Sequence, residues 1–364
     1  MNITRMKLDL FCHGVRLDPE LRAAFREYRP SKRASLSEGA SFNLKVDGKT
    51  FGLNVAVREP FIEKSPFRFS SSQGVILKND KPTIEAGMIG DPDWYKNRLP
   101  DGTPYGNIVQ LHGTNVLAVS LNNFCMFKKA GVGCKFCALG ASSKEDIVWK
   151  PGQVARIVED LTSNGMDLSE LNINSGTLNG KDQDAKFYLE VIEEVRKISD
   201  IPISAQILPP EDFEYIRALQ EAGLNTISFN LEIYDESIRG KVCPGKSSTS
   251  RKTYLLAMEK AVSIFGQNQV SSWVIAGLEP PKSTIQGIKE IASSGAIPFV
   301  AVFRPLLGTE LEEMSPPALE SLLRIFDALG EALEKEKLDP TLSSCGCVRC
   351  NCCSAFKEVY EHGL

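Results

Sequence analysis

The sequence predicts an α/β protein whose centre is a partial (β/α)6 TIM-like barrel, with an N-terminal β-rich domain before it and a Cys-rich C-terminal tail after it. Three observations support this fold. Six apolar runs alternate with six amphipathic helical segments between residues 116 and 335. Such alternation produces right-handed crossovers and a parallel sheet. Before residue 116 the sequence is rich in turn residues, and after residue 335 it contains closely spaced cysteines.

Residues 1–115 have the pattern of short strands joined by turns. Asp47-Gly48 and Asn79-Asp80 each lie between two segments of alternating hydrophobicity, as hairpin turns do. Residues 91–104 are rich in Asp, Pro and Gly, which is typical of a connector. We therefore predict a β-rich domain over residues 1–115.

The barrel is predicted over residues 116–335 and the tail over residues 336–364. The predicted strands are VLAVSL, ELNINS, PISAQIL, TISFNLEI, VSSWVIAG and PFVAVFR. Several of the helical segments that follow them end in Gly or Asn-Gly, as helix C-termini prefer. Because barrels of this kind carry their chemistry at the C-terminal ends of the strands, the loops after these strands are the first place to look for a site.

The composition is that of an ordinary soluble globular protein. Lys and Arg total 42 against 46 Asp and Glu, for a net charge of −4. This balance argues against a nucleic-acid-binding protein with a basic surface and against a polybasic membrane binder. The first residues are broken by charges and resemble no signal peptide, and no apolar run approaches the roughly 18 residues of a spanning helix. We therefore expect a cytoplasmic protein that binds neither nucleic acid nor membrane.

The ten cysteines are clustered rather than scattered. Cys125, Cys134 and Cys137 directly follow the first predicted barrel strand. A structural zinc site has four protein ligands, and no fourth Cys or His lies close to these three in sequence. Three thiolates suit a [4Fe-4S] cluster that keeps one iron open for a substrate or cofactor. An incidental group of cysteines and a zinc loop completed from elsewhere are the alternatives.

The loop SLNNFCMFKKAGVGCKFCALG resembles that of the radical S-adenosylmethionine (SAM) superfamily, including an aromatic residue, Phe136, before the last cysteine. The usual spacing there is Cys-x3-Cys-x2-Cys, so the longer gap between Cys125 and Cys134 is a departure that leaves the number of ligands unchanged. The resemblance covers residues 116–335. It implies a [4Fe-4S] cluster on the three cysteines and SAM on its open iron.

The same resemblance implies an activity and a set of SAM-binding residues. Reductive cleavage of SAM would give a 5′-deoxyadenosyl radical that abstracts hydrogen from a small-molecule substrate, in an oxygen-sensitive enzyme served by an external donor of flavodoxin or ferredoxin type. The residues placed against SAM, besides Phe136, are Ser175, Gly176, Thr177, Asn230, Glu232, Gly277 and Arg304, the last at the barrel mouth. A role of Glu232 as a helix cap or salt-bridge partner is the alternative.

A narrower resemblance covers nearly the whole chain. The segments HGVRLD, DGTPY, LHG and CKFCALG are similar to an uncharacterised radical SAM family associated with nitrilase gene clusters, whose members also end in a Cys-rich tail. This resemblance implies no established reaction.

The tail contains a second set of cysteines. Cys347, Cys350 and Cys353 are evenly spaced, and Cys345 or Cys352 could supply a fourth ligand. We predict an auxiliary Fe–S cluster on Cys345, Cys347, Cys350 and Cys353, because the chain already uses iron–sulfur chemistry. A zinc ion that pins the C-terminus and a redox-active pair of thiols are the alternatives.

Several other motifs carry weaker predictions. Residues 240–247 fit the Walker A string, but they do not directly follow a predicted strand, so we predict no phosphate loop. Residues 239–252 form a basic loop that either binds an anion at the barrel mouth or is solvated; Cys243 in it either faces the site or has no role. His13 and His112 are predicted to be structural. The competing function is a zinc-stabilised barrel that acts as a binding or scaffold protein.

Overall fold

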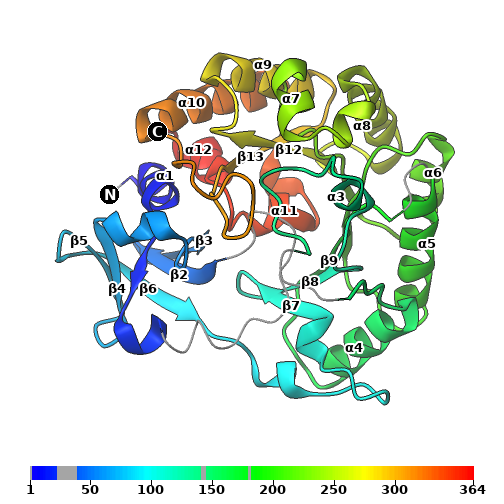
Figure 1. Ribbon diagram of the computed structural model, residues 1–364, viewed down its shortest axis with the longest axis horizontal. Helices are drawn as coiled ribbons and strands as arrows, with labels where there is room; N and C mark the ends of the chain where they lie inside the picture. Colours follow the sequence, from blue (N-terminus) through cyan, green and yellow to red (C-terminus); the bar gives the residue numbers. More distant parts are fainter. Residues whose placement is uncertain (1, 23–38, 141–144, 179–181) are drawn as a thin grey trace.

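A computed structural model describes residues 2–22, 39–140, 145–178 and 182–364. Its larger sheet has seven strands in the order β13-β12-β11-β10-β9-β8-β7. The first barrel strand, β8 (Val116–Ser120), is parallel to its successor, whereas β7 (Val109–His112) pairs with it antiparallel and extends the sheet by one strand. Figure 1 shows the sheet curled into a half-barrel with helices on its outer face.

The predicted alternation of strands and helices is confirmed. The remaining strands are β9 (Glu170–Asn174), β10 (Ile203–Gln206), β11 (Thr226–Ser228), β12 (Val270–Ala276) and β13 (Ile297–Val302). The outer helices are α4 (Pro151–Ser163), α5 (Gln183–Arg196), α6 (Glu214–Glu221), α8 (Arg251–Phe265), α9 (Pro281–Ser293) and α10 (Leu319–Lys335). Every residue of β12 and β13 is buried, as expected for parallel strands covered on both faces.

Strand β11 is shorter than predicted and ends at Ser228 rather than near Ile233. The Ser228 hydroxyl donates to Asn230 Oδ1 (2.7 Å), and the Leu231 amide donates to Ser272 Oγ (3.2 Å), so side chains replace part of the backbone ladder. Glu232 then adopts a φ of 67° and rejoins the sheet through one bridge to Val274. The regular pairing of β11 therefore ends at Ser228, where polar side chains begin to take over the hydrogen bonds.

The N-terminal part forms a six-stranded sheet in the order β1-β4-β5-β6-β2-β3. Its strands are β1 (Arg16–Leu17), β2 (Ala40–Val46), β3 (Lys49–Val55), β4 (Phe67–Ser70), β5 (Val75–Lys78) and β6 (Lys81–Ile89). A short 3-10 turn, η2 (Pro60–Lys64), lies between β3 and β4, and two more, η3 (Asp93–Lys96) and η4 (Tyr105–Asn107), follow β6. Both predicted hairpins are present. The two central residues of each turn, Asp47-Gly48 and Asn79-Asp80, have positive φ, which matches the twist of a two-residue hairpin.

The prediction of strands alone in this part is wrong at its start, where α1 (Ile3–His13) forms. The Asn2 side chain accepts a hydrogen bond from the Arg5 amide (2.8 Å) and caps the first turn. Ile3, Lys7 and Phe11 are spaced at helical intervals and are buried. Because Lys7 interrupts the apolar residues on the buried face, the pattern of hydrophobicity alone did not predict this helix.

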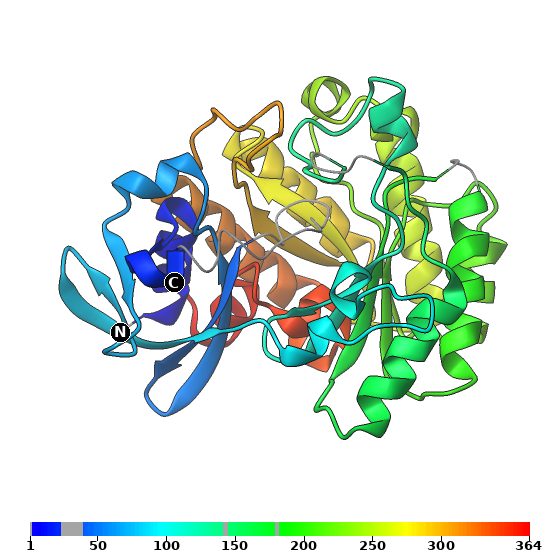
Figure 2. The same cartoon turned by 60° about the horizontal axis from the view of Figure 1, so that its bottom comes forward.

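The tail folds back under the half-barrel. After α10 come η6 (Pro340–Leu342), α11 (Gly346–Cys350) and α12 (Phe356–His362). In Figures 1 and 2, α11 lies inside the curve of the sheet, between the strands and the N-terminal sheet. A Cβ on Gly346 would lie 3.0 Å from Ser204 Cβ and 3.1 Å from Thr226 Oγ1, at the start of β10 and β11. The tail therefore closes the end of the barrel at which the parallel strands begin.

Two apolar clusters hold the structure together. One joins α1 and the N-terminal sheet to β12, β13, α10 and the tail, and the other lies between β7–β11 and their helices. The N-terminal segment and the tail thus share a core with one side of the barrel. The division into domains 1–115, 116–335 and 336–364 stays a prediction. In the described part of the chain, no helix combines the length and apolarity needed to cross a membrane.

A buried ion pair fastens the tail to α1. Lys7 Nζ lies 2.7 Å from Glu358 Oε1 and donates to the Asn351 carbonyl (3.0 Å), and the two charged side chains are 0% and 3% exposed. Lys7→Met leaves a buried carboxylate without its cation, so we expect the free energy of unfolding in urea to fall by about 3–5 kcal/mol. Lys45→Met breaks an exposed pair with Glu85 and should cost under about 1 kcal/mol. Equal losses in the two variants would contradict this account.

Candidate active site

A cavity of about 1,320 Å³, including the part open to solvent, runs through the half-barrel. Its wall contains polar residues from within or directly after β9, β10 and β11, together with Trp273 and Phe299, whose rings stack 4.8 Å apart. The loop after β8 forms its rim, and the tail with His112 forms its floor. The cavity therefore joins the loop after β8 to the tail, and polar and aromatic side chains line the space between them.

All three cysteines of the loop after β8 line this cavity. The loop contains one short helical turn, α3 (Met126–Lys129), directly after Cys125. The Met126 amide donates to the Thr177 carbonyl (2.8 Å), and the Cys137 amide donates to the Cys134 carbonyl (3.1 Å). The first bond ties the start of the loop to the chain after β9, and the second closes a turn between the last two cysteines. All three thiols line the cavity despite the larger spacing between the first two cysteines.

Two thiols of this loop, those of Cys134 and Cys137, have a pKa raised by their surroundings. Burial raises the pKa of Cys137 to about 12. A hydrogen bond with Cys243 and burial together raise the pKa of Cys134 well above its usual value. Cys243 is itself buried, at the end of α7 (Glu236–Val242). Since metals bind thiolates, a metal at this loop must displace these protons, and its affinity will depend on pH.

Six residues predicted to bind SAM line the cavity: Phe136, Ser175, Gly176, Thr177, Asn230 and Glu232. Gly277 and Arg304 do not belong to its described wall. Gly277 packs against Pro317, whose ring would lie 3.0 Å from an added Cβ. Arg304 is buried and donates to the carbonyl of Asn54 in β3 (2.8 Å). Arg304 was expected at the barrel mouth; in the structure its guanidinium is bound by Asn54 of β3.

Gly176 is held close to the cysteine loop by Asn122. The Gly176 amide donates to Asn122 Oδ1 (2.7 Å), and Asn122 Nδ2 donates to the Gly176 carbonyl (2.8 Å). A Cβ at Gly176 would lie 2.0 Å from the Phe124 carbonyl oxygen and 2.4 Å from Leu139 Cδ2. Glycine is therefore required at this position by the close approach of the loop, whatever else it contacts.

The basic loop contributes a partly buried cation whose role the sequence left undecided. Lys246 lines the cavity, and its Nζ lies 2.7 Å from Glu232 Oε1; the two side chains are 19% and 8% exposed. Burial alone would lower the pKa of Lys246, but Glu232 and Cys134 raise it above its usual value. Arg239 is also buried and donates to the carbonyls of Thr249 and Lys246, which fixes the loop.

The Walker A string does not form a phosphate loop. Gly240 lies inside α7, and Lys246 begins a single 3-10 turn, η5 (Lys246–Ser248), rather than a long helix that follows a strand. This agrees with the prediction drawn from its sequence context. Of the basic residues in the loop, Lys246 faces the cavity and Arg239 supports the backbone.

His112 was expected to be structural, and the structure places it in the cavity wall. Its Nε2 lies 3.5 Å from Cys353 Sγ. Burial alone would lower the pKa of His112, but Cys353 and Cys350 raise it to about 9. No sequence signal links these residues, which are 241 positions apart. His13 pairs instead with Asp9 on α1 (3.0 Å).

The tail brings four of its cysteines to the cavity floor: Cys347, Cys350, Cys352 and Cys353. Cys345 faces a different part of the barrel, against Thr226 Oγ1 (3.3 Å). Among the described residues, no three or more His, Cys, Asp or Glu side chains are gathered in metal-binding geometry.

The sequence profile of the radical SAM superfamily matches residues 119–277, a segment that runs from β8 to the end of β12 and includes the three-cysteine loop. The chain carries a radical SAM domain. This match confirms the predicted class of enzyme, and a radical SAM domain implies a [4Fe-4S] cluster and SAM as cofactors. No finding supports the alternative of a barrel without radical chemistry.

Relatives of the radical SAM domain include bacteriochlorophyllide c C-7(1)-hydroxylase of Chlorobaculum limnaeum, 25% identical over 263 residues. The alignment covers 65% of this chain and 64% of that protein, so the chain spans less than two thirds of its relative's length. Among solved structures, methylornithine synthase is 16% identical with a TM-score of 0.47, covering 62% of this chain and 64% of that one. A radical SAM methyltransferase from Sphaerobacter thermophilus is 14% identical with a TM-score of 0.47, covering 66% and 73%.

Proposed function

We propose that this chain is a radical SAM enzyme that abstracts hydrogen from a small molecule held inside the half-barrel. Cys125, Cys134 and Cys137 would hold three irons of a [4Fe-4S] cluster, with the fourth iron left for SAM. When bound and reduced, this cluster supplies the electron that cleaves SAM into methionine and a 5′-deoxyadenosyl radical. The observation that carries the proposal is that the three thiols open into one large cavity within the segment that matches the superfamily.

The residues around the cavity fit this cofactor pair. Three soft sulfur donors suit iron–sulfur binding. Ser175, Thr177 and Asn230 offer hydroxyl and amide groups for the polar parts of SAM, and Lys246 offers a cation for its carboxylate. Stacked Trp273 and Phe299 form an apolar wall farther inside. Such a wall keeps water away from a reactive intermediate.

The substrate would occupy the space between the rim and the floor. Asn172 and Gln206 provide polar contacts, beside the two aromatic rings. The relative from Chlorobaculum limnaeum is named for a hydroxylation. Hydrogen abstraction from carbon is one way in which such a reaction can begin, so hydroxylated products are among those to be sought.

Three further expectations belong to the same proposal. A flavodoxin- or ferredoxin-type protein would supply the electron. The tail would hold an auxiliary Fe–S cluster or zinc. The segments HGVRLD and CKFCALG, with the Cys-rich tail, support a place in the radical SAM family associated with nitrilase gene clusters.

The test is reconstitution without oxygen, followed by dithionite and SAM. We expect a brown protein that absorbs near 400 nm and forms 5′-deoxyadenosine and methionine in equal amounts. Deuterium from a labelled true substrate should appear in the 5′-deoxyadenosine. A colourless protein that retains zinc and leaves SAM intact would instead favour the scaffold function.

A further inference from the structure

A second group of metal-ligating side chains lies at the floor of the cavity, and one of its members comes from outside the tail. Cys347, Cys350 and Cys353 belong to the tail, whereas His112 is the last residue of β7. We propose that these four side chains hold a second metal centre, which faces the same cavity as the three-cysteine loop. The proposal deepens the proposed function, because a substrate would then lie between two centres.

The four donors are neighbours although they lie far apart in the sequence. His112 Nε2 is 3.5 Å from Cys353 Sγ, and the same imidazole interacts with the thiol of Cys350. Cys347 interacts electrostatically with both Cys350 and Cys353. The imidazole therefore lies beside two of the three thiols, and Cys347 lines the same floor of the cavity.

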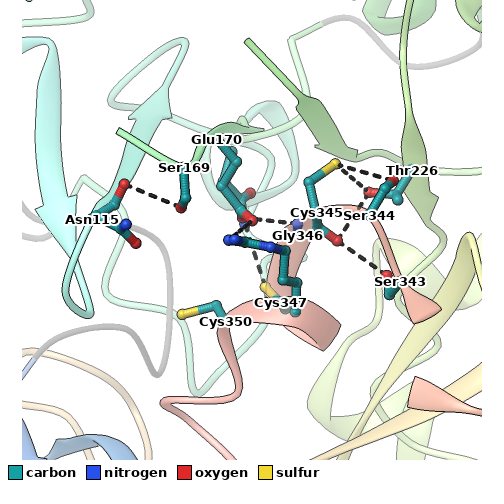
Figure 3. A network of polar contacts seen from close by, with 12 residues as sticks. Asn115, Ser169, Glu170, Thr226, Ser343, Ser344, Cys345, Gly346, Cys347 and Cys350 are labelled. Atoms are coloured by element: carbon teal, nitrogen blue, oxygen red, sulfur yellow. Dashed lines mark hydrogen bonds and ion pairs between the residues drawn. The ribbon is translucent and has the colours of Figure 1, made fainter. Parts of the chain in front are cut away.

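Of the two other tail cysteines, Cys345 is engaged elsewhere, whereas Cys352 stays at the cavity floor beside Cys350. In Figure 3, the Cys345 sulfur points toward Thr226, away from Cys347 and Cys350. Cys352 donates to the Cys350 carbonyl (3.4 Å). Its sulfur packs against Gly52 and Gly113, where an added Cβ atom would lie 2.6 Å and 2.8 Å from it, respectively. The fourth ligand predicted from the sequence, Cys345, is thus turned away, and His112 takes its place.

The surroundings of these donors are suited to a thiolate centre. Gln206 Nε2 donates to Cys347 Sγ (3.2 Å), and Asn172 Nδ2 lies 3.6 Å from the same sulfur. Amide donors of this kind orient metal ligands and stabilise their charge. Glu170 accepts from the Gly346 amide (2.8 Å) and pairs with Arg349 (3.4 Å), which anchors α11 beneath the strands (Figure 3).

The donor set defines the class of metal. Three thiolates and one imidazole bind either zinc or an iron–sulfur cluster, and they disfavour magnesium and calcium, which prefer oxygen. The shared chemistry is a soft-metal centre of three sulfurs and one nitrogen. Metal and sulfide analysis distinguishes its two possible occupants.

The experiment separates this centre from the first one by removing the first. In a Cys125→Ala, Cys134→Ala, Cys137→Ala background, we expect one centre per chain after anaerobic reconstitution with iron and sulfide or with zinc alone. Adding His112→Ala should reduce the metal retained against a chelator at least tenfold, whereas His112→Cys should restore it. Cys345→Ser is the matched control and should retain the metal. Circular dichroism checks that each variant is folded.

A spectroscopic readout identifies the nitrogen ligand directly. Pulsed electron paramagnetic resonance should show nitrogen coupling to a reduced cluster, or X-ray absorption should show three sulfurs and one nitrogen around zinc, and either signature should disappear in His112→Cys. A background that binds no metal, full retention in His112→Ala, or loss in Cys345→Ser alone would overturn the proposal. None of these readouts uses SAM cleavage, so the proposed function is tested independently by 5′-deoxyadenosine formation in the native chain.

Discussion

Replacing Cys134 with alanine is expected to abolish SAM cleavage and to remove about four irons per chain. Cys134 lines the cavity together with Cys125 and Cys137. Without it, only two thiolates remain, and two do not suffice to hold a cubane cluster with one open iron. Iron and sulfide analysis after anaerobic reconstitution, together with a 5′-deoxyadenosine assay, measures both effects.

The control for this variant is Cys12→Ala. Cys12 is a buried thiol of α1 whose pKa burial raises to about 12, and it is absent from the described cavity wall. This variant should keep its iron and its activity. Because Cys243 lies against Cys134 and could substitute as a ligand, Cys134→Ala/Cys243→Ala closes that route. Formation of 5′-deoxyadenosine at the native rate by the double variant would show that the cluster is held elsewhere.

Gly176→Ala is expected to disrupt the cysteine loop without changing any sulfur. The new methyl group would stand 2.0 Å from the Phe124 carbonyl oxygen, one residue before Cys125, so the loop or strand end must shift. Overpacking of this kind costs about 1–3 kcal/mol, and the shift should lower the iron content together with the free energy of unfolding in urea.

Gly240→Ala is the matched substitution. Gly240 lies within α7, and an added Cβ there meets no atom within 4 Å. Alanine in a helix interior is favoured over glycine by up to about 1 kcal/mol, so this variant should be as stable as the native chain or slightly more so. If Gly176→Ala keeps its full iron content and stability, the close approach of loop and strand end does not exist in solution.

The parts of the fold that follow from local pattern were predictable from the sequence. The hairpin at Asp47-Gly48 follows from residues that tolerate positive φ, and β12 and β13 follow from apolar runs long enough for buried strands. The early end of β11 and the helix α1 were not predicted. In the first, polar side chains compete with the backbone ladder, and in the second, a buried lysine finds its partner in the tail.

The candidate site likewise combines ligands that the sequence predicts with contacts that only the fold creates. By itself, the sequence determined the three-cysteine loop and the tail cysteines as candidate ligands, because ligand spacing along a short segment is a local property. Only the tertiary structure decided that His112 meets the tail, that Cys345 turns toward Thr226, that Arg304 is taken up by β3, and that Lys246 pairs with Glu232. These contacts join segments far apart in the chain, and they form only when the curl of the half-barrel brings its rim, wall and floor around one cavity.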